Sequence, residues 1–294
     1  MSRSNIIADK KFLSAIGHWP KIPSQVNPER WLNDFDDEDA LHAESLLESL
    51  IFFSQEQTTK LTTSLFHALS GEVTSTQRGY AARRSSWEQF IEKCFITYPT
   101  GEVPHPADSG HAFIRLARQQ LGFPESRLKF PEHVVEELYR GTRNPIVMVD
   151  DFAGSGDQFL KTWHRSYTMD DGQTASFHTV AKDAPVEVFY LPAVATQYAI
   201  DRIEDAARGV HVRTAHVLSE RYSAVHPDSV VFPEELRANA RDFLARASKR
   251  AGIDDELGWN NLALVIAFDH SVPNATLPII WSDTPTWNPL LRRS

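Results

Sequence analysis

The sequence is poor in three features: cysteine, positive charge and long apolar runs. Cys94 is the single cysteine among 294 residues. No disulfide can form within the chain, and this composition fits a reducing compartment. Lysine and arginine total 30 against 39 acidic residues, which gives a formal net charge of -9. This charge argues against direct nucleic-acid binding, although a local basic patch is compatible with it.

The chain also lacks the apolar segments that membranes require. No apolar run approaches the roughly 20 residues that span a bilayer, and residues 1–11 lack the apolar stretch of a signal peptide. We therefore expect a cytoplasmic protein without a membrane anchor. The hydrophobic content of 41% suffices to bury the core of one large domain, or of a core domain with an addition.

The N-terminal third differs in pattern from the rest. Residues 1–27 are polar with scattered prolines and are predicted to form an arm. Apolar residues at helical spacing predict helices at 36–54 and 61–69, and the polar stretch 71–86 reads as a connection. The predicted division is an N-terminal arm and helical section at 1–86 and an α/β domain at 87–294.

After Trp87, short apolar runs alternate with amphipathic segments. The predicted strands are 95–98, 146–149, 186–191, 210–218 and 262–268, with 277–281 as a further candidate. The predicted helices are 109–121, 131–140, 157–167, 196–207 and 233–250. This alternation predicts an α/β fold with a mainly parallel sheet flanked by helices. Ligands of such sheets bind beyond the carboxyl ends of the strands.

The run from Asn144 to Phe159 carries the strongest functional signal. An apolar strand ends in Asp150 and Asp151, and a loop with two glycines leads into a segment that can start a helix. Backbone N–H groups of this loop, with the positive end of the helix, can hold a phosphate, while the carboxylates accept hydrogen bonds from sugar hydroxyls. The substrate-binding residues predicted here are Ala153, Gly154, Ser155, Gly156, Asp157 and Gln158.

Two considerations weigh against this interpretation. The loop can instead be a solvent-facing turn in which Ser155 or Asp157 caps the helix. Asp157 would also place a negative charge beside the bound phosphate, so its side chain must point away or the affinity must suffer. The order of strand, acid pair and glycine loop nevertheless favours a ligand site.

Two further segments can contribute substrate contacts. Ser109 and Gly110 begin a predicted helix at the same expected sheet edge, where they can face a diphosphate or simply cap the helix. Arg221 and Tyr222 follow a predicted strand and are candidate contacts to a diphosphate and a base. A salt bridge with Glu220 or Asp228 explains Arg221 equally well.

Histidines offer other chemistry. His216, His226 and Asp228 invite a metal site, but their spacing matches no compact ligand pattern. Asp269 and His270 end a predicted strand, where the pair can orient an imidazole for proton transfer or satisfy a turn.

The acidic pair and its loop resemble the phosphoribosyl-diphosphate motif of the phosphoribosyltransferases. Asp150 and Asp151 match its acidic pair, Ser155 and Gly156 match its Thr-Gly, and Gln158 departs from it. The chain from Trp31 onward is similar to one branch, the phosphoribosyltransferase-like family of bacterial conflict systems. The residues that carry this similarity are Trp31, 108–110, 149–159, 190–192, 215–218, 220–222, 226–229, 272–278 and Trp287.

The resemblance implies a ligand, a cofactor and partners. The ligand is phosphoribosyl diphosphate or a nucleotide, bound with Mg²⁺ at Asp150 and Asp151, which also become the catalytic residues that transfer or hydrolyse the phosphoribosyl group. Members of that family are proposed effectors in anti-phage loci, some beside reverse transcriptases of retrons, so the resemblance implies partner proteins such as a retron reverse transcriptase.

Two alternatives to this enzyme remain. The same pocket can sense a nucleotide or phosphoribosyl diphosphate without turnover and signal to a partner protein, because fold alone does not determine function. The acid pair can also be the Mg²⁺ site of a nuclease or phosphatase. This last reading ranks lowest, because no separated Asp-x-Asp or upstream glutamate motif accompanies the pair.

Overall fold

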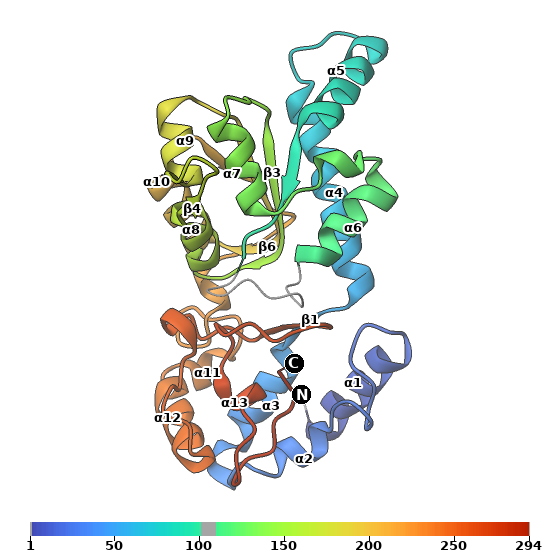
Figure 1. The fold of residues 1–294 in the computed structure, drawn as a ribbon. Helices are drawn as coiled ribbons and strands as arrows, with labels where there is room; N and C mark the ends of the chain where they lie inside the picture. Colours follow the sequence, from blue (N-terminus) through green and yellow to red (C-terminus); the bar gives the residue numbers. More distant parts are fainter. Residues whose placement is uncertain (1, 101–109, 294) are drawn as a thin grey trace. The chain divides into compact units, whose positions relative to one another are not determined.

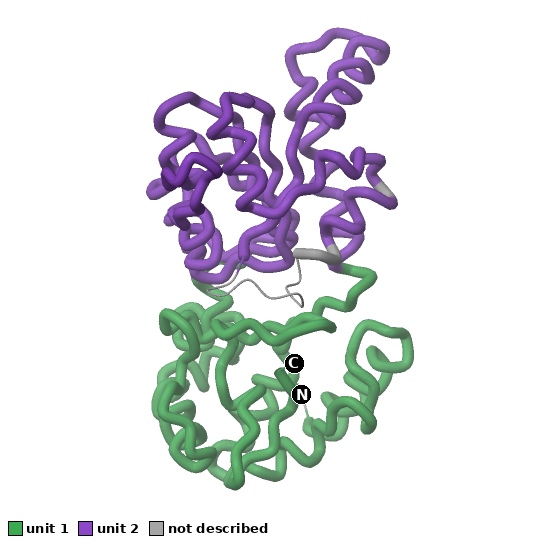
Figure 2. The backbone as a smooth tube through the Cα atoms, in the orientation of Figure 1, with its two compact units in different colours: residues 1–57, 218–294 green, residues 58–217 purple. Residues whose placement is uncertain are grey.

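The computed structural model describes residues 2–100 and 110–293, and the chain divides into two compact units (Figure 2). Unit 1 combines residues 1–57 with 218–294, and unit 2 is the contiguous segment 58–217. The chain passes between them within helix α4 (Gln55–Val73) and strand β8 (His216–Leu218). These boundaries differ from the division after residue 86 that we expected from the sequence.

Unit 2 is built around a five-stranded sheet. Four strands pair in parallel in the order β2 (Phe95–Thr97), β3 (Ile146–Ala153), β6 (Val188–Thr196) and β7 (Val210–Val212), and β8 pairs with β6. Apolar runs form β3 and β6 because central strands of a parallel sheet are buried on both faces. The predicted parallel sheet is confirmed.

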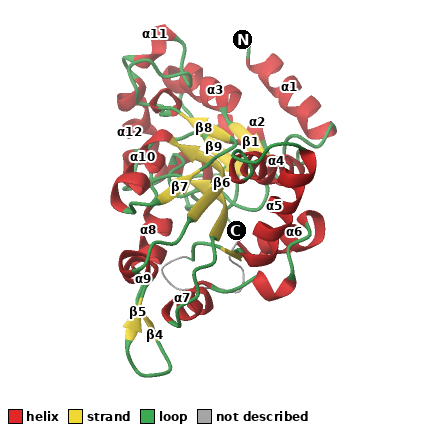
Figure 3. Ribbon diagram, turned by 90° about the horizontal axis from the view of Figure 1, so that it is seen from above, coloured by secondary structure: helices red, strands yellow, loops and turns green. Residues whose placement is uncertain are grey.

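Side chains of the central strands alternate between two cores. Met148 and Tyr190 belong to one apolar cluster, and Val149 and Leu191 belong to another, as the period of two along a strand requires. Helices cover both faces of the sheet (Figures 1 and 3). One layer contains α7 (Pro131–Tyr139), α8 (Asp157–His164), α9 (Phe177–Asp183) and α10 (Gln197–Ala206), and the other contains α4, α5 (Tyr80–Lys93) and α6 (Gly110–Leu121).

Some elements of unit 2 differ from the prediction. The segment 71–86, expected to be a connection, contains the end of α4 and the start of α5. Helix α5 buries only Phe90, so its sequence has almost no apolar stripe from which the helix could be predicted. The predicted strand 210–218 is two strands, β7 and β8, and a short hairpin of β4 (Tyr167–Thr168) and β5 (Thr174–Ala175) follows α8.

Unit 1 is mainly helical. Its helices are α1 (Arg3–Ala15), α2 (Pro28–Leu32), α3 (Ala40–Ser49), α11 (Glu234–Arg237), α12 (Ala240–Ala251) and α13 (Pro278–Trp281), and it contains the parallel strand pair β1 (Ile51–Phe53) and β9 (Ile266–Phe268). The described residues also form four short 3₁₀ helices, at 37–39, 220–222 and 259–261 in unit 1 and at 125–127 in unit 2. No helix within the described residues is both long and apolar enough to cross a membrane.

Two expectations for unit 1 are wrong. Residues 1–27 do not form a polar arm, because α1 is helical and Ile6, Ile7 and Trp19 are buried in the core of the unit. The candidate strand 277–281 is helix α13, which begins with Pro278 at its first position, where proline is favoured.

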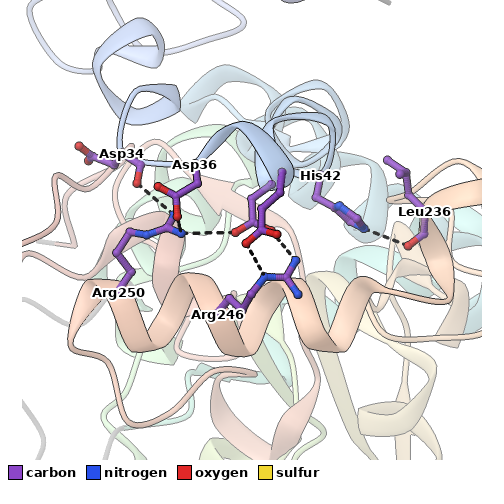
Figure 4. Close-up of polar contacts among 8 residues, drawn as sticks. Asp34, Asp36, His42, Leu236, Arg246 and Arg250 are labelled. Carbon is purple, nitrogen blue, oxygen red and sulfur yellow. Dashed lines mark hydrogen bonds and ion pairs between the residues drawn. The ribbon is translucent and has the colours of Figure 1, made fainter.

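An ionic cluster joins the start of α3 to α12 (Figure 4). The carboxylate of Asp39 is fully buried and lies 2.5 Å from Nη2 of Arg246 and 3.6 Å from Nη2 of Arg250. Arg250 also pairs with Asp36. Beside the cluster, Nε2 of His42 lies 3.0 Å from the carbonyl oxygen of Leu236. The hydrogen bond from Arg246 to Oδ1 and the ion pair with Arg250 offset the cost of burying the Asp39 carboxylate, while its Oδ2 has no hydrogen-bond partner among the described residues.

Candidate functional site

The predicted acid pair lies near the carboxyl end of β3, inside the protein. Asp150 is 3% exposed and Asp151 is 8% exposed. The hydroxyl of Tyr190 on β6 donates to Oδ2 of Asp150 at 2.8 Å, and the backbone N–H of Asp151 donates to its Oδ1 at 3.0 Å. Both oxygens of Asp150 are therefore held by the scaffold.

Burial sets the charge of this pair. Desolvation, followed by the neighbouring Asp151 carboxylate, raises the pKa of Asp150 well above its usual range. Burial and the Asp150 charge likewise raise the pKa of Tyr190, so its hydroxyl keeps its proton and remains a donor. The pair favours one shared negative charge over two, and a cation placed against it would favour ionisation of both acids.

The loop after β3 turns sharply into α8. Gly156 has φ +78°, and a Cβ there would lie 3.0 Å from Cγ1 of Ile203, so both the backbone and the space require glycine. The Ser155 hydroxyl accepts the N–H of Asp157 at 3.3 Å, a contact that the helix-capping alternative also predicts. Within the described part of the chain, the N–H groups of Ser155 and Gly156 have no hydrogen-bond acceptor. Such groups at a helix start suit an anion.

Helix α10, which follows the neighbouring strand β6, contacts this loop. Nη1 of Arg202 donates to the carbonyl of Ser155 at 2.8 Å and pairs with Oδ1 of Asp157 at 2.6 Å. The Thr196 hydroxyl donates to the carbonyl of Gly154. The negative charge of Asp157 would disfavour a phosphate bound at this loop. The ion pair with Arg202 reduces this repulsion, because it offsets the charge of Asp157.

Arg202 was not identified from the sequence. The available signal is topological: α10 follows β6, and β6 pairs with β3 in parallel, so the loops after both strands open at the same sheet edge. Finding the residue needs the register of the two strands, which the pattern of apolar residues does not fix.

The segment that follows β2 contacts the first turns of α8. Nε2 of Gln158 donates to the carbonyl of Pro99 at 3.2 Å, and the Thr162 hydroxyl accepts the N–H of Thr100 at 2.9 Å. Gln158, the position that departs from the phosphoribosyl-diphosphate motif, thus contacts the scaffold. Its predicted substrate contact stays a prediction, as does that of Ala153, the last residue of β3.

The remaining candidates are not brought to the acid pair by the described structure. Ser109 lies outside the described residues, and Gly110 is the first residue of α6. Arg221 and Tyr222 form a short 3₁₀ helix in unit 1, where Nε of Arg221 donates to the carbonyl of Asp228 at 3.1 Å. Their substrate contacts stay predictions.

The histidine candidates have structural partners. Nδ1 of His226 accepts the N–H of Asp228 at 3.0 Å, and its Nε2 lies 3.8 Å from Glu220. Within residues 2–100 and 110–293, no group of three or more histidine, cysteine or acidic side chains is arranged to hold a metal ion. A Mg²⁺ ion at Asp150 and Asp151 therefore fits only with further oxygen ligands from a diphosphate or from water, which is the usual manner of Mg²⁺ binding.

Comparisons with known proteins found a matching family model and similar solved structures, including the two that follow. A family model described as PRTase-CE matches residues 28–293. The crystal structure of orotate phosphoribosyltransferase from Aeropyrum pernix is 15% identical over 55% of this chain and 69% of that chain, with a TM-score of 0.29. The structure of AQ2163 protein from Aquifex aeolicus is 12% identical over 74% of this chain and 86% of that chain, with a TM-score of 0.31. No curated protein matches the sequence.

Proposed function

Because the chain belongs to the PRTase-CE family, whose model matches residues 28–293, we propose that it binds phosphoribosyl diphosphate or a nucleotide and transfers or hydrolyses the phosphoribosyl group. The match confirms the resemblance to a phosphoribosyltransferase-like family. The observation that carries the proposal is the loop from β3 to α8. It combines a buried acid pair with backbone N–H groups at a helix start.

In this proposal the 5-phosphate binds the loop and the ribose binds the acids. The N–H groups of Ser155 and Gly156 donate to the phosphate, and Arg202 offsets the negative charge of Asp157 beside it. Asp151 and Asp150 accept hydrogen bonds from the ribose hydroxyls. Departure of diphosphate leaves positive charge on the sugar ring, and carboxylates close to that charge stabilise the transition state.

Mg²⁺ would neutralise negative charge on the diphosphate, and Asp150 and Asp151 would be the protein ligands of the ion. The raised pKa of Asp150 fits this role, because an acid that is neutral without a cation ionises when one binds. The Tyr190 hydroxyl fixes the orientation of Asp150 in either state.

Calorimetric titration with phosphoribosyl diphosphate and Mg²⁺ tests the binding site. We expect Asp151→Asn to weaken binding at least about tenfold, a loss of about 1.4 kcal/mol, and the exposed control Asp205→Asn on α10 to bind as the wild type does. Equal affinities for the wild type and Asp151→Asn would reject the assigned site.

A protein that senses the same ligand without turnover is the second candidate. The contacts of Thr196 and Arg202 with the loop hold it in place for binding, and neither side chain contributes a reacting group. Diphosphate release, measured over a panel of nucleobases and nucleotides, separates the two. An enzyme releases diphosphate with at least one acceptor or with water, whereas a sensor binds without release.

The role in anti-phage defence, with a retron reverse transcriptase or another retron component as partner, rests on the family resemblance. Phage plating on cells that carry the whole locus, with either wild-type chain or Asp151→Asn, tests it. Protection that the variant abolishes supports an effector role, and equal protection contradicts a role for this site.

A further inference from the structure

Unit 1 contains a cavity of its own, remote in sequence from the loop after β3. Its volume is about 560 Å³, and all of its lining residues belong to unit 1. It lies at the carboxyl end of β1 and β9, which pair in parallel with Phe53 opposite Phe268. The N–H of Asp269 donates to the carbonyl of Phe53 at 2.9 Å and extends this pairing. The carboxyl edge of parallel strands is where α/β proteins place ligands.

Part of the lining is apolar and aromatic. It includes Phe52 on β1, Phe268 on β9, Val272 and Leu290. Phe268 and Val272 are buried, while Phe52 is half-buried. The volume falls in the range of about 300–1,000 Å³ that is typical of pockets for ligands larger than a simple ion.

The charged groups of the lining point to the chemistry of the ligand. Arg30 and Arg292 both line the cavity, and within the described residues neither forms an ion pair with a carboxylate. Arg30 donates instead to the neutral amide oxygen of Asn288. Asp269 and Asp283 also line it, and their carboxylates accept no hydrogen bond from the described residues. Arginines without acidic partners are suited to phosphate.

We propose that this cavity binds a nucleoside monophosphate, at a site that shares no residue with the loop after β3. Arg30 and Arg292 hold the phosphate, and Phe52 and Phe268 provide the apolar wall for the base. The carboxylates of Asp269 and Asp283 accept hydrogen bonds from ribose hydroxyls or from base amino groups, which accounts for acids beside arginines in one cavity. Inorganic phosphate alone would leave the apolar wall and most of the volume unused.

Calorimetry on the full chain with AMP, GMP, CMP and UMP tests this site. We expect at least one of the four to bind the wild type, and the double variant Arg30→Gln/Arg292→Gln to bind it at least tenfold more weakly. Arg293→Gln is the matched control, because Arg293 is adjacent in sequence, lies over the Trp281 ring at 5.0 Å and does not line the cavity. Asp151→Asn alters the acid pair of unit 2 and not the cavity, so it should retain the affinity for the nucleotide that the arginine double variant loses.

Several results would overturn the proposal. These are no binding of any of the four nucleotides to the wild type, equal binding to the double variant, or loss of binding in Asp151→Asn alone, which would place the nucleotide at the loop of unit 2. Inorganic phosphate that binds as tightly as the nucleotide would remove the role of the apolar wall. The single variant Arg292→Gln, at an exposed residue, repeats the test without disturbing the contact of Arg30 with Asn288. Failure here leaves the phosphoribosyl site untouched, because that site is tested by phosphoribosyl diphosphate with Asp151→Asn, whereas this cavity is tested by nucleoside monophosphates with the arginine variants.

Discussion

Asp150 is the residue whose environment most constrains the proposed chemistry. It is buried beside a second acid and bound by a tyrosine hydroxyl and a backbone N–H. Carboxylates in such surroundings resist ionisation until a cation or a ligand hydroxyl group compensates them. The acid pair is therefore not a solvated turn, and under the proposed function a ligand compensates its burial.

The stability of the protein should depend on pH through Asp150. Its pKa is raised in the folded state, so above about pH 4, the ordinary range of an aspartic acid, the folded chain binds a proton that the unfolded chain has released. The free energy of unfolding then falls as pH rises, until pH exceeds the folded pKa, by at most about 1.4 kcal/mol per pH unit. The asparagine in Asp150→Asn resembles the protonated acid, so this variant should lack the decrease in the free energy of unfolding that Asp150 causes as pH rises.

Urea denaturation of both proteins between pH 4 and 8 measures the effect. We expect the stability of Asp150→Asn relative to the wild type to increase with pH. The exposed variant Asp205→Asn should instead follow the wild type. Parallel pH curves for the wild type and Asp150→Asn would mean that Asp150 is already ionised in the folded state.

Gly156 is the second residue that the site requires. Alanine at Gly156 should be destabilising for two reasons, a backbone at φ +78° and a Cβ 3.0 Å from the Ile203 side chain. Gly172 has a similar φ of +81° but open space around its Cα. We expect Gly172→Ala to lose about 1 kcal/mol of stability and Gly156→Ala to lose more, by thermal or urea unfolding. Equal losses would show that Ile203 moves aside without cost.

At the scale of elements, α10 determines the electrostatics of the loop after β3. Arg202→Ala removes the ion pair with Asp157 and the hydrogen bond to the Ser155 carbonyl. The uncompensated Asp157 carboxylate should then repel a bound phosphate, and we expect phosphoribosyl diphosphate with Mg²⁺ to bind at least about tenfold more weakly.

Charge removal at Asp157 should reverse that loss. The double variant Arg202→Ala/Asp157→Asn should regain most of the affinity in the same calorimetric titration, and the exposed control Arg208→Ala should bind as the wild type does. A double variant that binds no better than Arg202→Ala would show that Arg202 acts on the ligand or the loop directly and not through Asp157.

The ionic cluster on α12 should stabilise unit 1. Asp39 is fully buried, whereas Arg246 and Arg250 are partly exposed, so the arginines left by Asp39→Asn can still reach water. We therefore expect Asp39→Asn to cost about 1.5–3 kcal/mol, as for hydrogen bonds to charged groups, and Asp36→Asn, at an exposed acid of the same cluster, to cost less than about 1 kcal/mol. Urea unfolding measures both, and a smaller loss for Asp39→Asn than for Asp36→Asn would contradict this account.

At the scale of the whole molecule, unit 2 is contiguous in sequence and unit 1 is not. All strands of the main sheet and both helix layers come from α4 through β8. A fragment of residues 54–218 keeps α4 with Ser54, whose hydroxyl accepts the N–H of Gln57 at its start. We expect this fragment to unfold cooperatively on heating, and a fragment that stays unfolded would show that unit 2 depends on unit 1.

The sequence predicted unit 2 better than unit 1. The apolar run at 146–149 is short and mostly β-branched, which favours a strand buried on both faces, so β3 and the parallel sheet were predictable. In unit 1, the apolar spacing of α3 continues into Ile51, Phe52 and Phe53, so β1 was assigned to a helix. Its partner β9 lies about 200 residues later in the chain, and pairing at such a distance leaves no local pattern.

The candidate site divides in the same way. Asp150, Ser155 and Gly156 could be predicted as site candidates because they lie in one short segment, in the order of strand, acid pair and glycine loop that is typical of phosphate sites. Tyr190 and Arg202 were not, because each reaches the loop from the neighbouring strand or the helix that follows it. Their roles depend on strand register and side-chain direction, which only the folded arrangement specifies.

The most direct test of the account is a crystal structure of the chain with Mg²⁺ and phosphoribosyl diphosphate. The account predicts that the 5-phosphate accepts hydrogen bonds from the N–H groups of Ser155 and Gly156 and that a ribose hydroxyl donates to Asp151. Phosphoribosyl diphosphate bound elsewhere on the protein, with this loop and the acid pair unliganded, would contradict it.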